Sequence, residues 1–367
     1  MRSPVHGRAL IAALLVVVLV VVAGVVIVVT NALRTTPCDD VVLRSATPPP
    51  STATSAPTFG APAPGAPGPP PVGESGIVRR LRTALRGPSA AVFCDDAPDP
   101  FVLRVGGSYY AYSTNTAFAN VPVLTAGGLF GTGKQGDALP QLPAWSQAGR
   151  NWAPSVLPVG DRFVMYYSTR VGGSDQVCLS VASGGDPNGP FVDTSTGPLA
   201  CPAGTDAIDP SPFVDIDGRA YLLWRHGSEI VSQPLSADGL SLTGERRALL
   251  VPDQAWEGGV VEGPSMVDHE GRKYLFYSGN AWDSDRYAIG YAVCDTPQGP
   301  CAKQAGPWLA SSPGAQGPGG QEFFTDRSGR LWMVLHAWIH GKVGYPDGRR
   351  NVFVVPVAFV GGVPQAG

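Results

Sequence analysis

The chain after Arg86 has the hydrophobic pattern of a protein built from short strands. Apolar residues come in brief runs broken by Gly and Asp turns, and no stretch keeps the period of an amphipathic helix over three turns. One pattern recurs: a short apolar strand, a turn, and a strand rich in aromatic residues. Two strands joined by such a turn predict a hairpin. The five turn-and-strand copies are VGGSYYAYST, VGDRFVMYYST, DIDGRAYLLWR, DHEGRKYLFYSGN and DRSGRLWMVLHAW.

The spacing of these copies predicts the architecture. Their aligned aromatic residues lie 56, 55, 53 and 58 residues apart, which leaves room for two further strands in each repeat. Four strands in each of five repeats predict an all-β fold, a five-bladed β-propeller around a central channel. A β-sandwich or β-solenoid with irregular strands is the alternative, although sandwich strands do not recur at a fixed long period. The repeats align on Tyr110, Tyr166, Tyr221, Tyr274 and Trp332.

A different pattern lies near the N-terminus, where Ala9 to Val29 is an unbroken apolar run. A bilayer span needs about 20 apolar residues, whereas the apolar part of a cleavable signal peptide has about 7–15. Arg2 and Arg8 precede the run, so the positive-inside rule places the N-terminus in the cytoplasm and the rest outside. The run is therefore predicted to be a single-pass transmembrane signal-anchor in the cell membrane. A long signal peptide whose cleavage secretes the protein is the alternative.

The segment from 46 to 76 is rich in Pro, Ala, Gly, Ser and Thr and has no apolar period. Such a composition buries too little surface to fold and behaves as an extended spacer. The sequence therefore predicts three parts. They are a cytoplasmic tip and transmembrane helix at 1–34, an extracellular Pro-rich linker at 35–76, and the propeller domain at 77–367.

Composition and cysteine usage narrow the function classes. Charged residues make up 15% of the chain and the net charge is −3, so no nucleic-acid partner is expected. Six cysteines in an exported chain predict disulfides, and no C-x₂-C pair favours a zinc site. The short loop from Cys294 to Cys301 is the firmest pairing. Cys178 with Cys201 is suggested by spacing, which leaves Cys38 with Cys94.

Acidic residues recur where the first strand of each repeat begins. Counting back eight or nine residues from each turn reaches Asp99, Ala153, Asp209, Glu262 and Gly320. The first strand of a propeller blade lines the channel, so these positions are expected to form a ring. Three carboxylates on one narrow channel repel one another and shift their pKa values, which is costly unless the site uses them. The alternative is that the acids only begin the strands or bind a structural cation.

Paired carboxylates facing one cavity are typical of glycoside hydrolysis. One acid protonates the leaving oxygen, while a carboxylate activates water or attacks directly. Sugar sites also use aromatic side chains for stacking, and Trp145, Trp152 and Trp282 are expected near one rim. The alternative for each tryptophan is packing between blades.

The repeat segments together resemble glycoside hydrolase family 43, from about Asp96 to the C-terminus. The segments that carry the resemblance are DAPDPFVLRVGGSYYAYST, LPAWSQAGRNWAPSVLPVGDRFVMYYST, AIDPSPFVDIDGRAYLLWR, VVEGPSMVDHEGRKYLFYSGN and GPGGQEFFTDRSGRLWMVLHAW. That family contains five-bladed arabinanases, α-L-arabinofuranosidases and β-xylosidases. The resemblance implies an inverting mechanism in which Asp99 is the general base, Glu262 the general acid, and Asp209 a third acid that tunes the pKa of Glu262 and orients it.

The chain departs from the family pattern in the fifth repeat. Many members carry a His after Gly-Pro-Gly that helps to hold a cation on the propeller axis, whereas this chain has Gly320. No metal ligand is therefore assigned and no cofactor is expected to be required, although an axial Ca²⁺ ion is left open. His336 is a candidate contact for the substrate, or for a cation through water; a buried strand-end histidine is the alternative. Related fructosyl-cleaving propellers usually show Arg-Asp-Pro and Glu-Cys, where this chain has Ile208-Asp209-Pro210 and Glu262-Gly263.

The sequence thus predicts a membrane-anchored extracellular glycosidase, acting as a monomer on arabinofuranose- or xylose-containing carbohydrates. Substrate choice is expected to lie in rim loops at 116–141 and 298–317. The alternatives are a non-catalytic carbohydrate-binding or sensor propeller and a structural envelope protein.

Overall fold

The computed structural model describes residues 21–22, 25–26, 91–93, 95–129, 133–339 and 341–367. The chain divides into two compact units, Met1–Pro37 and Cys38–Gly367. In the first unit, the two-residue strands β1 (Val21–Val22) and β2 (Val25–Val26) pair antiparallel. Within the described ranges, no helix has the length and apolar character needed to cross a membrane. Apart from those two strands, the predicted anchor and linker lie outside the described residues.

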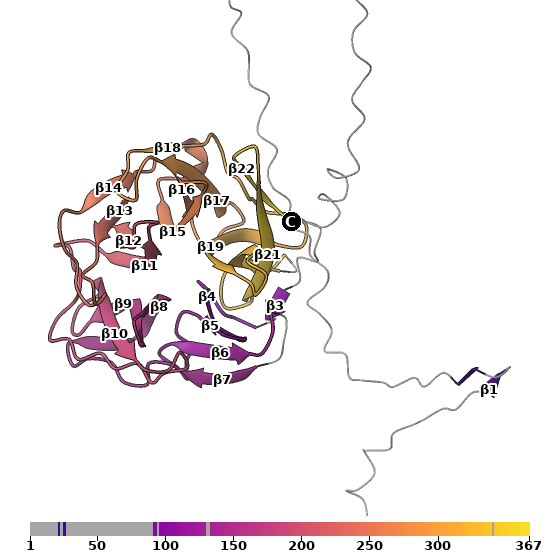
Figure 1. The fold of residues 1–367 in the computed structure, drawn as a ribbon, viewed down its shortest axis with the longest axis horizontal. Coiled ribbons are helices and arrows are strands. Elements are labelled where there is room, and N and C mark those ends of the chain that lie inside the picture. Colours follow the sequence, from indigo (N-terminus) through magenta and orange to yellow (C-terminus); the bar gives the residue numbers. More distant parts are fainter. Residues whose placement is uncertain (1–20, 23–24, 27–90, 94, 130–132, 340) are drawn as a thin grey trace, which may run out of the picture. The chain divides into compact units, whose positions relative to one another are not determined.

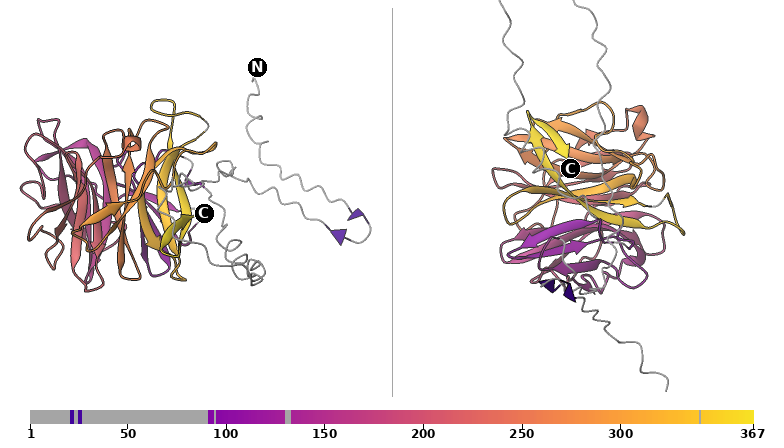
Figure 2. Two further views of the ribbon diagram at one scale, coloured as in Figure 1. Left: turned by 90° about the horizontal axis from the view of Figure 1, so that it is seen from above. Right: turned by 90° about the vertical axis from the view of Figure 1, so that its right-hand side faces the viewer.

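The second unit is a ring of five antiparallel sheets around a central axis, as Figures 1 and 2 show. Each sheet uses strands that follow one another in the chain, so one sequence repeat makes one blade. The prediction of an all-β five-bladed propeller is confirmed. The only helix in the described part of the chain is the 3₁₀ turn η1 (Ala255–Glu257). The blades are β4 (Phe101–Val105) to β7 (Lys134–Asp137), β8 (Ser146–Val159) to β10 (Val177–Gly184), β11 (Ala207–Val214) to β14 (Arg247–Leu250), β15 (Val261–His269) to β18 (Cys301–Lys303), and β19 (Gln316–Thr325) to β22 (Val363–Ala366).

Within the blades, the first and second strands match the repeated hairpins found in the sequence. The second strands are β5 (Ser108–Tyr112), β9 (Arg162–Val171), β12 (Ala220–His226), β16 (Arg272–Gly279) and β20 (Leu331–Trp338). The third strands, besides β10, are β6 (Pro122–Ala126), β13 (Glu229–Pro234), β17 (Ala288–Cys294) and β21 (Arg350–Val360).

A strand from before the first blade closes the ring. β3 (Ala91–Phe93) pairs antiparallel with β21, with Phe93 opposite Val352. The fifth blade therefore contains segments from both ends of the domain. This pairing ties the first described strand of the domain to its last blade.

The repeated aromatic residues build the core. Tyr166, Tyr221, Tyr274 and Trp332 are all at most 8% exposed, and they pack in clusters that join neighbouring blades. Burying a large aromatic side chain stabilises a fold by about 1.5–3 kcal/mol, which favours an aromatic residue at this place; Tyr110 of blade one is only partly buried. The alignment of the second repeat needs a correction. Val164 pairs with Leu157 at the place where Tyr221 pairs with Phe213, so Tyr166 lies two residues further along its strand.

Both disulfides suggested by spacing within the propeller are present, Cys178–Cys201 and Cys294–Cys301. The second joins β17 to β18 in blade four, where the two cysteines face each other. The first compensates for a short sheet, because blade two has three strands and the following segment touches β10 only through isolated bridges, one of them Leu179 with Ala200. The predicted pair of Cys38 and Cys94 lies outside the described residues.

Candidate active site

The inner strand of each blade carries a left-handed turn where it enters the channel. Four of the five turn residues are followed by proline. Aspartate tolerates this backbone region better than most residues, and glycine adopts it freely. The sequence count was one residue out in blade four, where Gly263 occupies the turn and Glu262 precedes it. The turn residues are Asp99 (φ 51°), Ala153 (φ 45°), Asp209 (φ 59°), Gly263 (φ 54°) and Gly320 (φ 58°).

A hydrogen bond from the preceding blade holds four of these turns. In each case the turn residue's backbone N–H donates to a side chain at the end of the second strand of that blade. Within its own blade, this side chain lies at the end of the second strand, opposite the residue just before the turn of the first strand. The bonds run from Ala153 to Thr114 Oγ1 (3.0 Å), from Asp209 to Ser168 Oγ (3.1 Å), from Gly320 to Ser278 Oγ (3.0 Å) and from Asp99 to His336 Nδ1 (3.0 Å).

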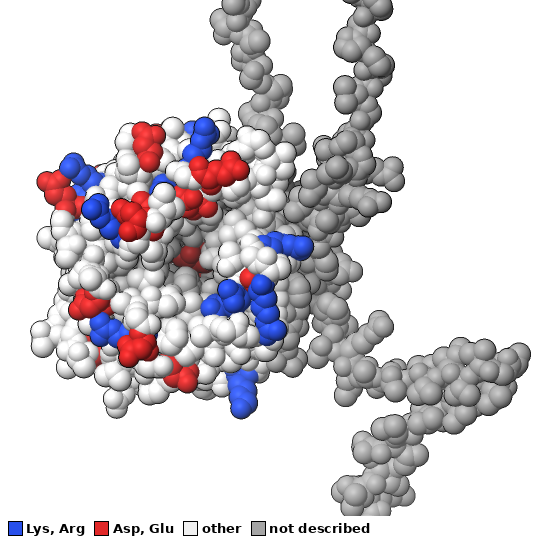
Figure 3. Space-filling view, in the orientation of Figure 1, with Lys and Arg blue, Asp and Glu red and all other residues white. Residues whose placement is uncertain are grey.

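The turns bring the three predicted acids into one pocket. Asp99, Asp209 and Glu262 all line a cavity of about 1810 Å³ that opens at the channel. In the space-filling view, this face is hollowed at its centre, and acidic atoms lie in the hollow (Figure 3). The convergence expected from the repeat is therefore present in the structure.

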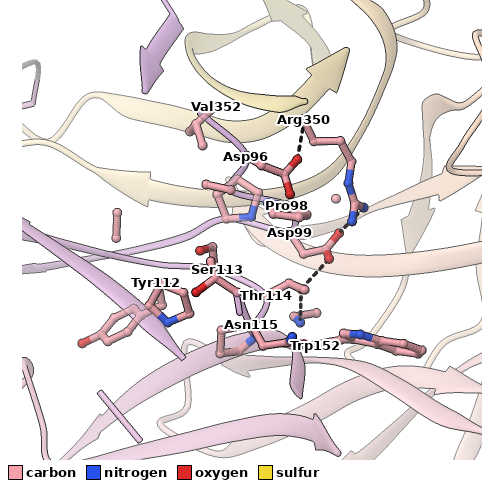
Figure 4. Close-up of a pocket in the computed structure, with 18 of the residues that line it drawn as sticks. Asp96, Pro98, Asp99, Tyr112, Ser113, Thr114, Asn115, Trp152, Arg350 and Val352 are labelled. Atoms are coloured by element: carbon pink, nitrogen blue, oxygen red, sulfur yellow. Dashed lines mark hydrogen bonds and ion pairs between the residues drawn. The ribbon is translucent and has the colours of Figure 1, made fainter. Parts of the chain in front are cut away.

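Asp99 keeps contact with solvent and is held by a hydroxyl group. Its Oδ2 accepts a hydrogen bond of 2.7 Å from Thr114 Oγ1, and its Oδ1 lies 3.8 Å from a guanidinium nitrogen of Arg350 (Figure 4). Because Thr114 accepts the N–H of Ala153, its own proton points to Asp99. The side chain of Asp99 remains 23% exposed. The carboxyl group of Asp99 can therefore still reach a water molecule.

Glu262 is more deeply buried and is held on both oxygens. Tyr287 Oη donates to Oε1 at 2.9 Å, and Arg225 donates to Oε2 at 2.7 Å. Its side chain is 10% exposed. Burial raises the pKa of Glu262 and the charge of Asp99 adds to the rise, while Arg225 and Tyr287 oppose it. A carboxyl group with a raised pKa can keep a proton for delivery.

Asp209 is linked to the backbone beside Glu262. Its Oδ2 accepts the N–H of Gly263 at 3.0 Å, which makes the fifth junction of the ring. Burial raises the pKa of Asp209 well above its ordinary value, and the charges of Glu262 and Asp99 raise it further. Since each of these acids disfavours the ionisation of another, the group retains a proton to higher pH than isolated carboxyls would.

The tryptophans predicted at the rim separate into two groups. Trp152 and Trp282 line the pocket, and Trp282 is 39% exposed. Trp145 is not among the pocket-lining residues; its indole N–H donates to Ser195 Oγ at 2.9 Å. Trp145 therefore packs on blade two away from the acids.

His336 is fully buried and has no surface for a substrate to touch. Its Nδ1 accepts the N–H of Asp99, so the ring proton lies on Nε2. Burial lowers the pKa of His336 to about 3, and the nearby charge of Arg350 contributes, so the ring is neutral and its 3.5 Å contact with Asp99 is not an ion pair. A Cβ atom at Gly320 would lie 2.6 Å from this ring. Glycine at 320 therefore makes room for His336.

The described residues place few metal-binding side chains close to one another. Among the residues that the structure describes, no group of three or more His, Cys, Asp or Glu side chains is arranged to hold a metal ion. An axial Ca²⁺ stays a prediction.

Several pocket residues were missed by the sequence reasoning. Thr114 and Arg225 could have been found by aligning the ends of the repeated strands, where YYAYST and YLFYS end in hydroxyl residues and YLLWR ends in Arg225. Arg350 and Tyr287 had no such signal. Phe118 lines the pocket, is 97% exposed, and lies in the loop between β5 and β6.

Comparisons with known proteins identify the family that the chain matches. Residues 90–364 match the model of the family described as "Glycosyl hydrolases family 43". The "Beta-D-galactofuranosidase xynD" of Aspergillus niger is 32% identical over 170 residues, covering 42% of this chain and 47% of that protein, so the chain matches about half of that relative's length. The "Probable arabinan endo-1,5-alpha-L-arabinosidase B" of Aspergillus fumigatus is 26% identical over 285 residues, covering 64% and 76%. One solved structure, "Crystal structure of a thermostable family-43 glycoside hydrolase", has a TM-score of 0.66 and 30% identity, covering 74% of this chain and 93% of that one.

Proposed function

Because the chain belongs to glycosyl hydrolases family 43 and is a glycosidase, we propose that it hydrolyses furanosidic or xylosidic bonds with inversion, arabinofuranosides first. The observation that carries the proposal is the unequal setting of two carboxyl groups in one pocket. Asp99 is partly exposed and bound by a hydroxyl, whereas Glu262 is buried with a raised pKa. An inverting glycosidase needs one ionised and one protonated carboxyl of this kind.

In the proposed reaction, Asp99 takes a proton from water as the water oxygen attacks the anomeric carbon. The glycosidic C–O bond breaks in the same step, and its oxygen takes the proton of Glu262. An inverting pair stands about 6.5–9.5 Å apart to admit the water. Asp209 holds the N–H of Gly263 and raises the proton affinity of the group, which supports a role in orienting and tuning Glu262.

The choice of sugar rests on the relatives. One matched protein is named for galactofuranose and another for arabinan. Both names support a furanoside as the substrate class. The exposed Trp282 and the neighbouring Trp152 supply aromatic surface on which a sugar face can stack.

The location of the enzyme is a separate proposal. The apolar run Ala9–Val29 supports a single-pass anchor with the propeller outside the cell. Sequencing the mature N-terminus from a membrane fraction tests it, because a start beyond Asn31 would show cleavage.

Proton NMR of the first product formed tests the mechanism. The full chain is first screened on aryl α-L-arabinofuranosides, β-D-galactofuranosides and β-D-xylosides, and the best substrate is followed at early times. We expect the released sugar to have the anomeric configuration opposite to that of the substrate. A product with the substrate's configuration would show a retaining mechanism and overturn the assignment of Asp99 as a base.

A further inference from the structure

Arg225 breaks the hydrogen-bonding pattern that holds the ring together. At the corresponding strand position the other four blades carry Thr114, Ser168, Ser278 or His336, each of which accepts the N–H of the next blade's turn. Arginine has only donors and cannot play this part. The turn of blade four is bound by Asp209 instead, which leaves the guanidinium free to contact the acid.

The guanidinium of Arg225 is fixed at two points. Its Nε donates to the backbone oxygen of Gly227 at 2.8 Å, within its own hairpin, and its terminal nitrogen donates to Glu262 Oε2 at 2.7 Å. The planar group therefore links blade three to the acid of blade four in one orientation. Its side chain is 28% exposed, so the contact lies at the edge of the pocket.

The contact distinguishes the two oxygens of Glu262. A guanidinium cannot accept a hydrogen bond, so a protonated Glu262 cannot point its O–H at Arg225, and a hydrogen on Oε2 would weaken that oxygen as an acceptor for the arginine N–H. Tyr287, on Oε1, has a hydroxyl that either donates or accepts. Protonation at Oε1 therefore needs only a rotation of the tyrosine hydroxyl.

We infer that Arg225 is a positioning residue for the general acid, which binds Oε2 and leaves Oε1 as the oxygen that delivers the proton. The inference rests on the proposed role of Glu262. Without Arg225, Oε2 loses the donor that holds it, so the carboxyl group can rotate and the proton is no longer directed at one point. Arg225 thus lowers the proton affinity of Glu262, but it fixes the direction in which the proton is transferred.

Four charged or titratable groups face Glu262, and they set the expected pH dependence. Arg225 and Tyr287 lower the pKa of Glu262, whereas burial and Asp99 raise it; Asp209 shares the same proton-binding group. Removing Arg225 should therefore raise the pKa of Glu262. The alkaline limb of the pH–rate profile, which reports the acid, should move to higher pH.

Two substitutions separate position from charge. Arg225→Ser introduces the acceptor found in the other blades, and Arg225→Lys keeps the positive charge but loses the planar fork. On a phenyl glycoside of the best sugar, we expect both variants to lower kcat about 10-fold or more, within the range of general acid catalysis. The loss should be smaller on the 4-nitrophenyl glycoside, and KM should stay within about 2-fold because the proton is delivered to the leaving oxygen only in the transition state. Only Arg225→Ser should move the alkaline limb.

Controls decide which statement fails. Arg247→Ser removes an exposed arginine that pairs with Glu245, and it should change nothing. An unchanged kcat and an unchanged alkaline limb in Arg225→Ser would overturn the inference. A large rise in KM alone would also overturn it and would make Arg225 a substrate ligand.

Glu262→Gln is measured in parallel on the same two glycosides. If that variant cleaves the phenyl glycoside normally, the proposed acid itself is wrong. If Arg225→Ser does not fold, Arg225→Lys alone still tests the leaving-group contrast.

Discussion

Asp99 and Glu262 occupy corresponding regions of blades one and four, yet the two carboxyl groups differ in solvent exposure and in hydrogen-bond partners. Asp99 is the turn residue itself, and it receives a hydroxyl hydrogen bond while keeping 23% of its side chain exposed. Glu262 precedes the turn, and it is buried between Arg225 and Tyr287. A shift of one residue along the same motif is therefore enough to change exposure, partners and proton affinity.

The comparison shows how a repeated fold can produce two different chemical roles. The left-handed turn is common to all five blades, but Asp99 is itself the turn residue whereas Glu262 precedes Gly263. The neighbouring side chains differ as well: Thr114 of the same blade contacts Asp99, and Arg225 of the preceding blade contacts Glu262. Environment sets the pKa and hence the role.

The largest expected effect separates the two acids by leaving group. Asp99→Ala should reduce kcat/KM on all glycosides by about 10²–10⁴-fold, because every substrate needs the water to be activated. Glu262→Ala should match this loss on phenyl glycosides but lose much less on 2,4-dinitrophenyl glycosides, whose leaving group needs no proton. Steady-state kinetics on the two aryl series measure the contrast. Equal losses across both series for Glu262→Ala would contradict the assignment of Glu262 as the acid that protonates the leaving group.

Asp209→Asn should move the alkaline limb without abolishing binding. The charge of Glu262 raises the pKa of Asp209, and because repulsion between two charges is reciprocal, a charged Asp209 also hinders the ionisation of Glu262. Removing one negative charge makes the remaining carboxyl easier to ionise, so its pKa falls and activity is lost at a lower pH on the alkaline side. The pH dependence of kcat/KM checks the shift. A large rise in KM with an unmoved alkaline limb would instead make Asp209 a substrate ligand.

Glu322 offers a comparison with a carboxyl that has no arginine partner among its main interactions. Its Oε2 accepts a hydrogen bond of 2.5 Å from Ser265, and burial raises its pKa from 4.5 to about 7. The folded state binds this proton more tightly than the unfolded chain does. The contribution of Glu322 to stability is therefore fully present below pH 4.5 and is lost as the pH rises toward 7. The loss corresponds to about 3 kcal/mol at most.

Glu322→Gln should remove most of that pH-dependent loss, since an amide keeps the shape and does not ionise. Urea unfolding of both proteins at pH 4.5 and pH 8 measures the difference. The variant's free energy of unfolding should decline less between the two pH values. An identical decline would mean that Glu322 ionises as easily in the folded protein as in the unfolded chain.

The sequence predicted those features that repeat and missed those that depend on how blades meet. Five hairpins, two disulfides and the Asp-Pro turns at Asp99 and Asp209 follow from local pattern. The offset between Glu262 and Gly263 does not, because a count of eight or nine residues cannot locate a bulge. The repeat locates the strand position of Arg225, but its contact with Glu262 crosses a blade junction and has no signal in the sequence.

The rim was also predicted only in part. The segment 116–141 does line the pocket, although it includes strands β6 and β7 (Lys134–Asp137). The segment 298–317, all of it described, contributes none of the lining residues; the stretch from Tyr345 to Arg350 contributes instead. Loop ends that lie far apart in sequence meet at the mouth, and their placement depends on ring closure rather than on composition.

The smallest expected effect concerns Phe118, on the Asp99 side of the pocket. Its ring is 97% exposed, and the turn that carries it is held by Thr116 Oγ1, which accepts the N–H groups of Phe118 and Ala119 at 3.2 Å. An aromatic ring held in solvent beside a sugar site can stack on a sugar unit beyond the cleaved bond. Phe118→Ala should therefore raise KM for an arabino-oligosaccharide about 3–10-fold, the effect of losing a contact of roughly 1 kcal/mol. The same variant should leave KM for a 4-nitrophenyl monosaccharide unchanged, and Phe118→Tyr should retain the oligosaccharide affinity. Equal KM changes on both substrates would show that the loop shapes the Asp99 side of the pocket as a whole, and no change on either would leave the ring without contact to the chain of sugars.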